Sequence, residues 1–131
     1  MEAKKENTKE TTFTLQDESG AGFIQVADDV VSSIAALAVL EVDGVSKLTG
    51  NINNDIVAKL GKRNLAKAVR ISFDEGKVVV GVILEAKFGY NLIQISKEVQ
   101  EKVKSSLMTM TGLECKEVNV KISGIDVDGK N

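Results

Sequence analysis

The chain of 131 residues contains no histidine, no proline and a single cysteine, Cys115. Without histidine it lacks the usual general base near neutral pH and the commonest metal ligand in proteins. One cysteine cannot form an internal disulfide or a CxxC site, which fits a reducing cytoplasm. The remaining side chains offer no nucleophile–base pair and no set of metal ligands, so we expect no enzymatic activity, no metal and no cofactor.

Long apolar runs and an excess of one charge are also missing. The longest apolar-rich stretch, residues 34–42, is about half the length that crosses a bilayer. Residues 1–10 are polar and lack the apolar centre of a signal peptide. The 17 basic and 19 acidic residues give a net charge of -2, so no global field draws the chain to nucleic acid or anionic lipid. We expect a cytoplasmic protein without a membrane span of its own.

The composition changes along the chain in a way that predicts one domain with polar ends. Residues 1–19 mix lysine, glutamate and threonine with little to bury, which is typical of a disordered tail. Within them, residues 12–15 alternate as an edge strand would. Residues 20–125 are long enough to bury a core without disulfides or metals. Residues 126–131 are polar again and are expected to fray.

The first half of this domain predicts a strand followed by a helix. Residues 23–26 favour a short strand, and Asp28 is placed to cap a helix over residues 29–42. Gly44 follows at a position where a left-handed conformation ends helices. Residues 45–66 are less regular and indicate one or two helical turns.

Two strands follow, over residues 69–73 and 78–86, with Gly76 in the turn between them. The second strand carries apolar residues on both faces, because Val79 and Ile83 lie opposite its main apolar row. Such a strand is covered on both sides. We expect the cover to be either residues 45–66 or another subunit.

The last part predicts a long helix and a final strand. Asn91 and Gln94 have the spacing of a capping box at the start of a helix over residues 91–110. Gly112 is placed to end the helix, and residues 117–122 alternate as a strand. The apolar stripe of the helix consists of Leu92, Ile95, Val99, Val103, Leu107 and Met110.

The predicted order is strand, helix, strand, strand, helix, strand. It indicates an α+β sandwich with two main helices on a mainly antiparallel sheet. A ferredoxin-like arrangement is the first expectation and a KH-like arrangement is the alternative.

Three stretches resemble the alkaline shock protein family, also called the general stress protein family, of Gram-positive bacteria. They are residues 22–31 running on to 41–45, residues 60–65, and residues 97–113 with 118–120. The resemblance covers roughly residues 20–125. The chain departs from the family pattern at two places: Gln94 follows Ile93 where proline is common, and Phe88 precedes Gly89 where tyrosine is common.

The resemblance implies a non-enzymatic protein linked to cell-envelope homeostasis under stress. Some members of the family gather at the membrane through an integral-membrane partner. For this chain it implies a membrane-anchored protein partner and a membrane-proximal position through that partner. Together with the missing catalytic side chains and the doubly apolar strand around Val79 and Ile83, it also predicts self-association into a homo-oligomer.

A basic cluster and two aromatic residues are the candidate interaction sites, together with Val79 and Ile83. Phe88 and Tyr90 stand before the long helix and belong either to the core or to an exposed contact site. The cluster is either a solvated turn or a site for phosphate, RNA or a lipid headgroup. It consists of Lys59, Lys62, Arg63, Lys67 and Arg70.

Binding of nucleic acid through this cluster is the alternative function, and two observations count against it. A KH domain clamps the nucleic-acid backbone with a GxxG loop, and the sequence Gly61-Lys62-Arg63-Asn64 lacks the second glycine. Aromatic residues make up 4% of the chain, which leaves no platform on which bases could stack.

Overall fold

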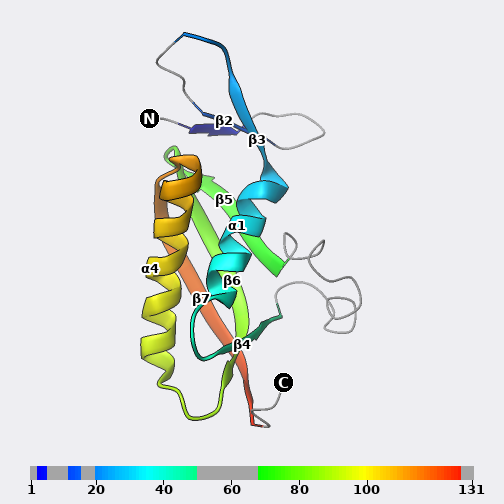
Figure 1. The fold of residues 1–131 in the computed structure, drawn as a ribbon, viewed down its shortest axis with the longest axis vertical. Coiled ribbons are helices and arrows are strands. Elements are labelled where there is room, and N and C mark those ends of the chain that lie inside the picture. Colours follow the sequence, from blue (N-terminus) through cyan, green and yellow to red (C-terminus); the bar gives the residue numbers. More distant parts are fainter. Residues whose placement is uncertain (1–2, 6–11, 16–19, 50–67, 128–131) are drawn as a thin grey trace.

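The structure, a computed structural model, describes residues 3–5, 12–15, 20–49 and 68–127 (Figure 1). Its elements are β1 (Ala3–Lys5), β2 (Thr12–Leu15), β3 (Ile24–Ala27), α1 (Asp28–Leu40), β4 (Val45–Leu48), β5 (Val69–Asp74), β6 (Lys77–Lys87), α4 (Leu92–Thr111) and β7 (Cys115–Asp126).

Strand β6 is the centre of the main sheet. β7 runs parallel to it along one edge, from Val78 to Lys87 of β6. The other edge is shared by β5, antiparallel to the first half of β6, and β4, antiparallel to its second half. Parallel neighbours need a crossover connection, and α4 supplies it between β6 and β7.

Helices α1 and α4 lie side by side on one face of this sheet (Figure 1). The strand period of two sends every second residue of β6 toward them. Hydrophobic burial against the helices therefore holds the layers together. The buried residues of β6 are Val78, Val80, Val82, Leu84 and Ala86, those of α4 include Ile95, Val99, Val103 and Leu107, and those of α1 include Val31, Ala35, Ala38 and Val39.

The predicted α+β class, with two helices on a mainly antiparallel sheet, is confirmed. Two strands differ from the predicted order. β3 is not part of the main sheet but pairs with β2 in a separate sheet of order β1-β2-β3. β4 forms at the start of the segment that was expected to be irregular, because β6 extends beyond β5 and offers its free edge there.

Strands are also present where residues 1–19 were expected to be disordered. β1 pairs with β2 and β2 with β3, both antiparallel. Hydrogen bonds between backbones require little apolar surface, so the polar composition of this segment did not reveal them. The strand pattern of residues 12–15 is the part that the sequence did indicate.

The ends of α4 agree with the capping predictions, and the start of α1 does not. Asn91 caps α4, since its Oδ1 accepts from the Gln94 amide at 2.9 Å, and Gly112 ends the helix with φ of 74°. Asp28 does not cap α1, because the helix already begins there and Ala27 is the N-cap residue. The predicted stripe of α4 is buried from Ile95 to Leu107, but its end residues Leu92 and Met110 are exposed, and Thr111 rather than Met110 is buried in the last turn.

Candidate functional site

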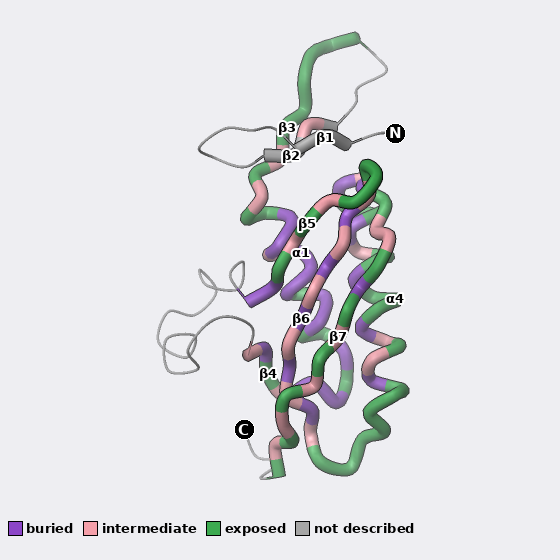
Figure 2. Tube along the Cα trace, turned by 180° about the vertical axis from the view of Figure 1, so that it is seen from behind, coloured by how far each residue is buried: buried purple, intermediate pink, exposed green. Residues whose placement is uncertain are grey.

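The sequence-predicted site residues fall into separate places in the structure. Lys59, Lys62, Arg63 and Lys67 lie outside the described residues. Arg70 is exposed on β5, and it shares the sheet face opposite the helices with Val79 and Ile83 of β6, both half-buried. Figure 2 looks onto this face. Phe88 and Tyr90 lie instead in the turn between β6 and α4.

The turn of residues 88–91 holds Phe88 outward. Its side chain is 73% exposed, while its backbone N–H donates to the carbonyl of Asp126 at 3.0 Å. Asp126 is itself fixed, because Ser46 Oγ donates to its Oδ2 at 2.8 Å. Gly89 has a φ of 100°, a left-handed conformation that side chains other than glycine rarely adopt. The exposed ring therefore stands on a backbone anchored to β4 and β7.

Tyr90 is held by the turn that follows α1. Its ring lies against Gly44, whose carbonyl accepts from the Lys87 amide at 2.7 Å. The ring is 48% exposed, so one side packs and the other faces solvent. Phe88 is therefore exposed rather than part of the core, and Tyr90 is partly packed. A contact with another molecule at these residues stays a prediction.

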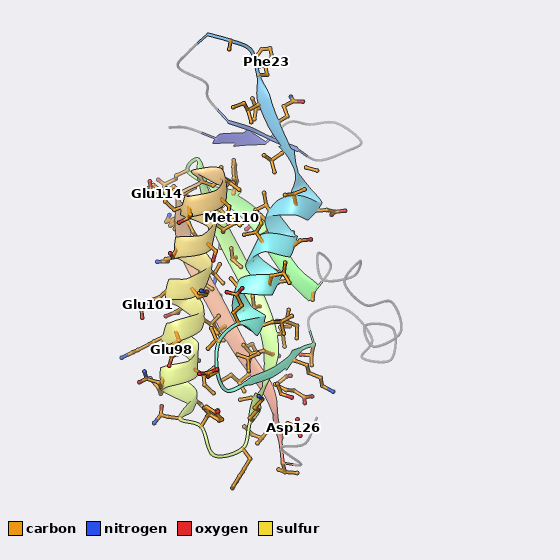
Figure 3. All side chains as sticks on the ribbon, viewed as in Figure 1. Phe23, Glu98, Glu101, Met110, Glu114 and Asp126 are labelled. Carbon is orange, nitrogen blue, oxygen red and sulfur yellow. The ribbon has the colours of Figure 1, made fainter. Side chains whose placement is uncertain are left out.

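Further apolar side chains are exposed near this turn. Ile93 is 66% exposed in the first turn of α4, and Ile125 and Val127 are exposed at the end of β7. We call Phe88, Tyr90, Ile93, Ile125 and Val127 the apolar end. Figure 3 places Asp126 at this extremity of the molecule and Phe23 at the opposite one. Exposed aromatic residues with apolar neighbours are typical of protein contact sites.

A second exposed apolar surface lies on α1, where the predicted helix pattern did not indicate one. Val30, Leu37 and Leu40 are exposed on the side of the helix that faces away from the core. A signal was present, because α1 carries only Asp28 and Asp29 as charged residues in 13 positions. A helix that is apolar all round is usually covered.

Cys115 has the surroundings of a packing residue. Burial raises the pKa of its thiol, an effect that Lys104 and a 3.4 Å hydrogen bond to the Glu117 carbonyl partly oppose. A raised pKa leaves little of the nucleophilic thiolate at neutral pH. A single cysteine in a chain without histidine is either a small apolar filler or a reactive thiol, and the raised pKa favours the filler.

The described part of the chain contains neither a cluster of metal ligands nor a helix suited to cross a membrane. Among these residues, no group of three or more histidine, cysteine, aspartate or glutamate side chains could hold a metal ion. None of the helices described there combines the length and the apolar character that a membrane crossing needs.

Comparison with known proteins finds relatives whose alignments cover most of this chain. The uncharacterized protein YqhY of Bacillus subtilis is 32% identical over 114 residues, which cover 87% of this chain and 84% of that protein. The uncharacterized protein Spy1614 of Streptococcus pyogenes is 29% identical over 91% of this chain and 100% of its own length. The uncharacterized protein YloU of Bacillus subtilis is 21% identical over 81% of this chain and 90% of its own length. No solved structure matches.

The profile of one protein family matches residues 16–127. That family is the ASP23 family, described by a cell envelope-related function. The match includes α1, the main sheet and α4, and the relatives come from Gram-positive bacteria, as the resemblance to the alkaline shock proteins implied. The chain therefore belongs to the ASP23 family, whose function is related to the cell envelope.

Proposed function

We propose that this protein is a non-enzymatic interaction protein of cell-envelope stress homeostasis, acting through self-association and through a membrane-associated partner. The observation that carries the proposal is Phe88, 73% exposed on a backbone anchored to Asp126. Because the backbone of Phe88 is already ordered, binding has to order only its side chain, which lowers the entropic cost of using it as an anchor. The family's envelope-related function supports the cellular setting.

The chemistry of the described residues supports an interaction role over catalysis. The thiol of Cys115 has a raised pKa because of burial. The acidic neighbours Asp74 and Glu75 share Lys116 as a counterion, which makes them part of a surface ion-pair cluster. Neither arrangement resembles a nucleophile with its base or a pair of carboxylates facing across a cleft.

The test of self-association compares two exposed phenylalanines. Phe88→Ser alters the apolar end, and Phe23→Ser is a matched control because Phe23 is 89% exposed at the opposite extremity (Figure 3). Sedimentation velocity over a concentration series should show association of the wild type and of Phe23→Ser. We expect Phe88→Ser to weaken it at least about tenfold, as loss of an aromatic anchor does. A wild type that stays monomeric at high concentration, or equal effects of both substitutions, would contradict the proposal.

The partner is tested separately. Affinity capture of the tagged protein from cells, with membranes solubilised by detergent, should recover an integral-membrane protein with the wild type and Phe23→Ser. Recovery should fall with Phe88→Ser. If no membrane protein is enriched over an unrelated tagged control, the membrane-associated part of the proposal fails while self-association can still stand.

A further inference from the structure

A hollow of about 260 Å³ lies on the sheet face opposite α1 and α4. Its floor is Gly81 in the middle of β6, and its walls include Arg70 from β5, Asn119 and Lys121 from β7, and Ile83. The register explains the grouping, because Gly81 is the direct partner of Arg70 on one side and of Asn119 on the other. Lys121 stands beside Ile83, one step further along the same face.

The backbone does not require glycine at position 81. Its φ lies outside the left-handed range that six other glycines occupy. A Cβ built on it would have one neighbour within 4 Å among the described residues, Arg70 Cβ at 3.8 Å, which is ordinary contact. Glycine in the interior of a strand is unfavourable for entropic reasons. What glycine does provide here is the depth of the hollow.

Two cationic side chains flank this hollow, and neither forms an ion pair among the described residues. Arg70 and Lys121 are exposed and form no ion pair there, whereas Lys47, Lys77, Lys102 and Lys116 each pair with a carboxylate. Two acidic side chains share this face: Glu85 of β6, two residues beyond Ile83, which pairs with Lys47 at 3.9 Å, and Glu117 of β7. Glu117 accepts a long hydrogen bond of 3.5 Å from Asn119 Nδ2. The charge around the hollow is therefore positive, and Glu117 reduces it.

We propose that this hollow binds a phosphoryl group. The planar guanidinium of Arg70 can donate to two phosphoryl oxygens, Lys121 supplies a second positive charge, and the Asn119 amide supplies a neutral donor. The volume is below that of pockets for drug-sized ligands, about 300–1,000 Å³, so it suits one small group. The half-buried side chain of Ile83 offers an apolar wall for the part of the ligand next to the phosphoryl group.

The central variant is Gly81→Val, which fills the hollow and leaves both cations in place. Titration with inorganic phosphate at constant ionic strength, followed by amide chemical shifts, should perturb residues 70, 81, 119 and 121 of the wild type. We expect Gly81→Val to weaken this binding at least about tenfold, and Arg70→Gln to do the same. Gly81→Val should keep or raise the melting temperature, since valine favours strands, so lost binding would not mean lost folding.

Two further variants separate a site from general attraction of anions. Glu117→Gln removes the opposing charge and should tighten binding by a few-fold. Lys97→Gln removes one positive charge from α4 and should leave phosphate binding unchanged. Absence of perturbation at the four amides, or equal affinity of the wild type and Gly81→Val, would overturn the proposal. Equal weakening by Lys97→Gln would do so as well, because binding would then follow net charge.

A second experiment determines whether the phosphoryl group belongs to a free small molecule or to a lipid headgroup. Glycerol 3-phosphate represents a free metabolite, and vesicles of phosphatidylcholine with phosphatidylglycerol represent a lipid headgroup. Binding of glycerol 3-phosphate that Gly81→Val abolishes assigns the site to a small molecule. Vesicle cosedimentation that Gly81→Val abolishes assigns it to a membrane surface. If Gly81→Val abolishes neither, the hollow is not a phosphoryl site.

Discussion

The ring of Tyr90 occupies the space where a side chain of residue 44 would be. A Cβ on Gly44 would lie 2.7 Å from Tyr90 Cδ2 and 3.0 Å from Ile95 Cδ1. Gly44 also has a φ of 96°. The glycine after α1 thus serves two purposes: it permits the left-handed turn into β4, and it lets the turn before α4 close over it.

This contact predicts that Gly44→Ala is strongly destabilising. The left-handed φ costs about 1–2 kcal/mol for an alanine, and the overlap with Tyr90 adds about 1–3 kcal/mol. Urea unfolding measures the sum. Gly76→Ala is the matched control, because Gly76 has a φ of 80° but nothing within 4 Å of a Cβ among the described residues. Gly76→Ala should therefore lose only the part of the free energy of unfolding that comes from the left-handed φ. Equal losses for the two variants would show that the Tyr90 contact carries no energy.

A second prediction concerns the start of α4. Asn91→Ala removes the acceptor of the Gln94 amide and should reduce the free energy of unfolding by about 1 kcal/mol. Asn91→Ser should restore most of this loss, because serine also accepts from a free amide at the helix start. Both variants are compared by chemical denaturation. If Asn91→Ser is as destabilised as Asn91→Ala, the cap is not the reason for the loss.

The ends of α4 and the turn between β5 and β6 were predictable because their signals are local, although the cap expected at Asp28 was wrong. Asn91, Gly76 and Gly112 each occupy a position whose requirement is set by three or four neighbouring residues. The separate sheet of β1, β2 and β3 was not predictable in the same way, because a sequence pattern does not say with which distant edge a strand pairs. Strand β4 was missed for the same reason.

The candidate site was predicted unevenly. Phe88 and Arg70 stand out in the sequence by residue type, and both are exposed. The pairing of Gly81 with Asn119 depends on the parallel register of β6 and β7, which only the fold fixes. The exposed residues of α1 could have been suspected from its nearly uncharged sequence, since helix periodicity separates its two faces.

The ion pairs of Lys116 predict that the stability of the fold changes at alkaline pH. Its Nζ lies 2.8 Å from Asp74 Oδ2 and 2.9 Å from Glu75 Oε1. Hydrogen bonds to these two carboxylates, Asp74 first, raise the pKa of Lys116 in the folded state. The stabilisation is therefore fully present below the ordinary lysine pKa of about 10.4 and is lost as the pH rises through the higher folded value. The site is at the surface, so the effect is small.

The measurement for Lys116 compares unfolding of the wild type and of Lys116→Gln near pH 8 and near pH 11.5. The wild type should be the more stable protein near pH 8, and the difference should shrink at the higher pH. Lys97→Gln serves as the control, because Lys97 has no ion pair among the described residues. A difference that stays constant with pH would mean that Lys116 contributes through packing of its chain rather than its charge.

Cys115 gives a prediction about reactivity. Burial raises the pKa of its thiol, and the positive charge of Lys104 is the strongest opposing influence. Because the thiolate is the species that reacts, alkylation by iodoacetamide near pH 8 should be several-fold slower in the folded protein than in the protein unfolded in urea. The inflection of the rate with pH should lie above about 8.5, the value of a free thiol.

Replacement of Lys104 tests the cause of this reactivity. Lys104→Gln removes the charge that lowers the pKa of Cys115, so the inflection should move to still higher pH and the rate near pH 8 should fall further. Lys97→Gln lies on the same helix and should leave both quantities unchanged. Mass spectrometry of the alkylated peptide gives the rates. A folded protein that reacts as fast as the unfolded one would show that Cys115 is accessible and unperturbed, and its assignment as a packing residue would then be wrong.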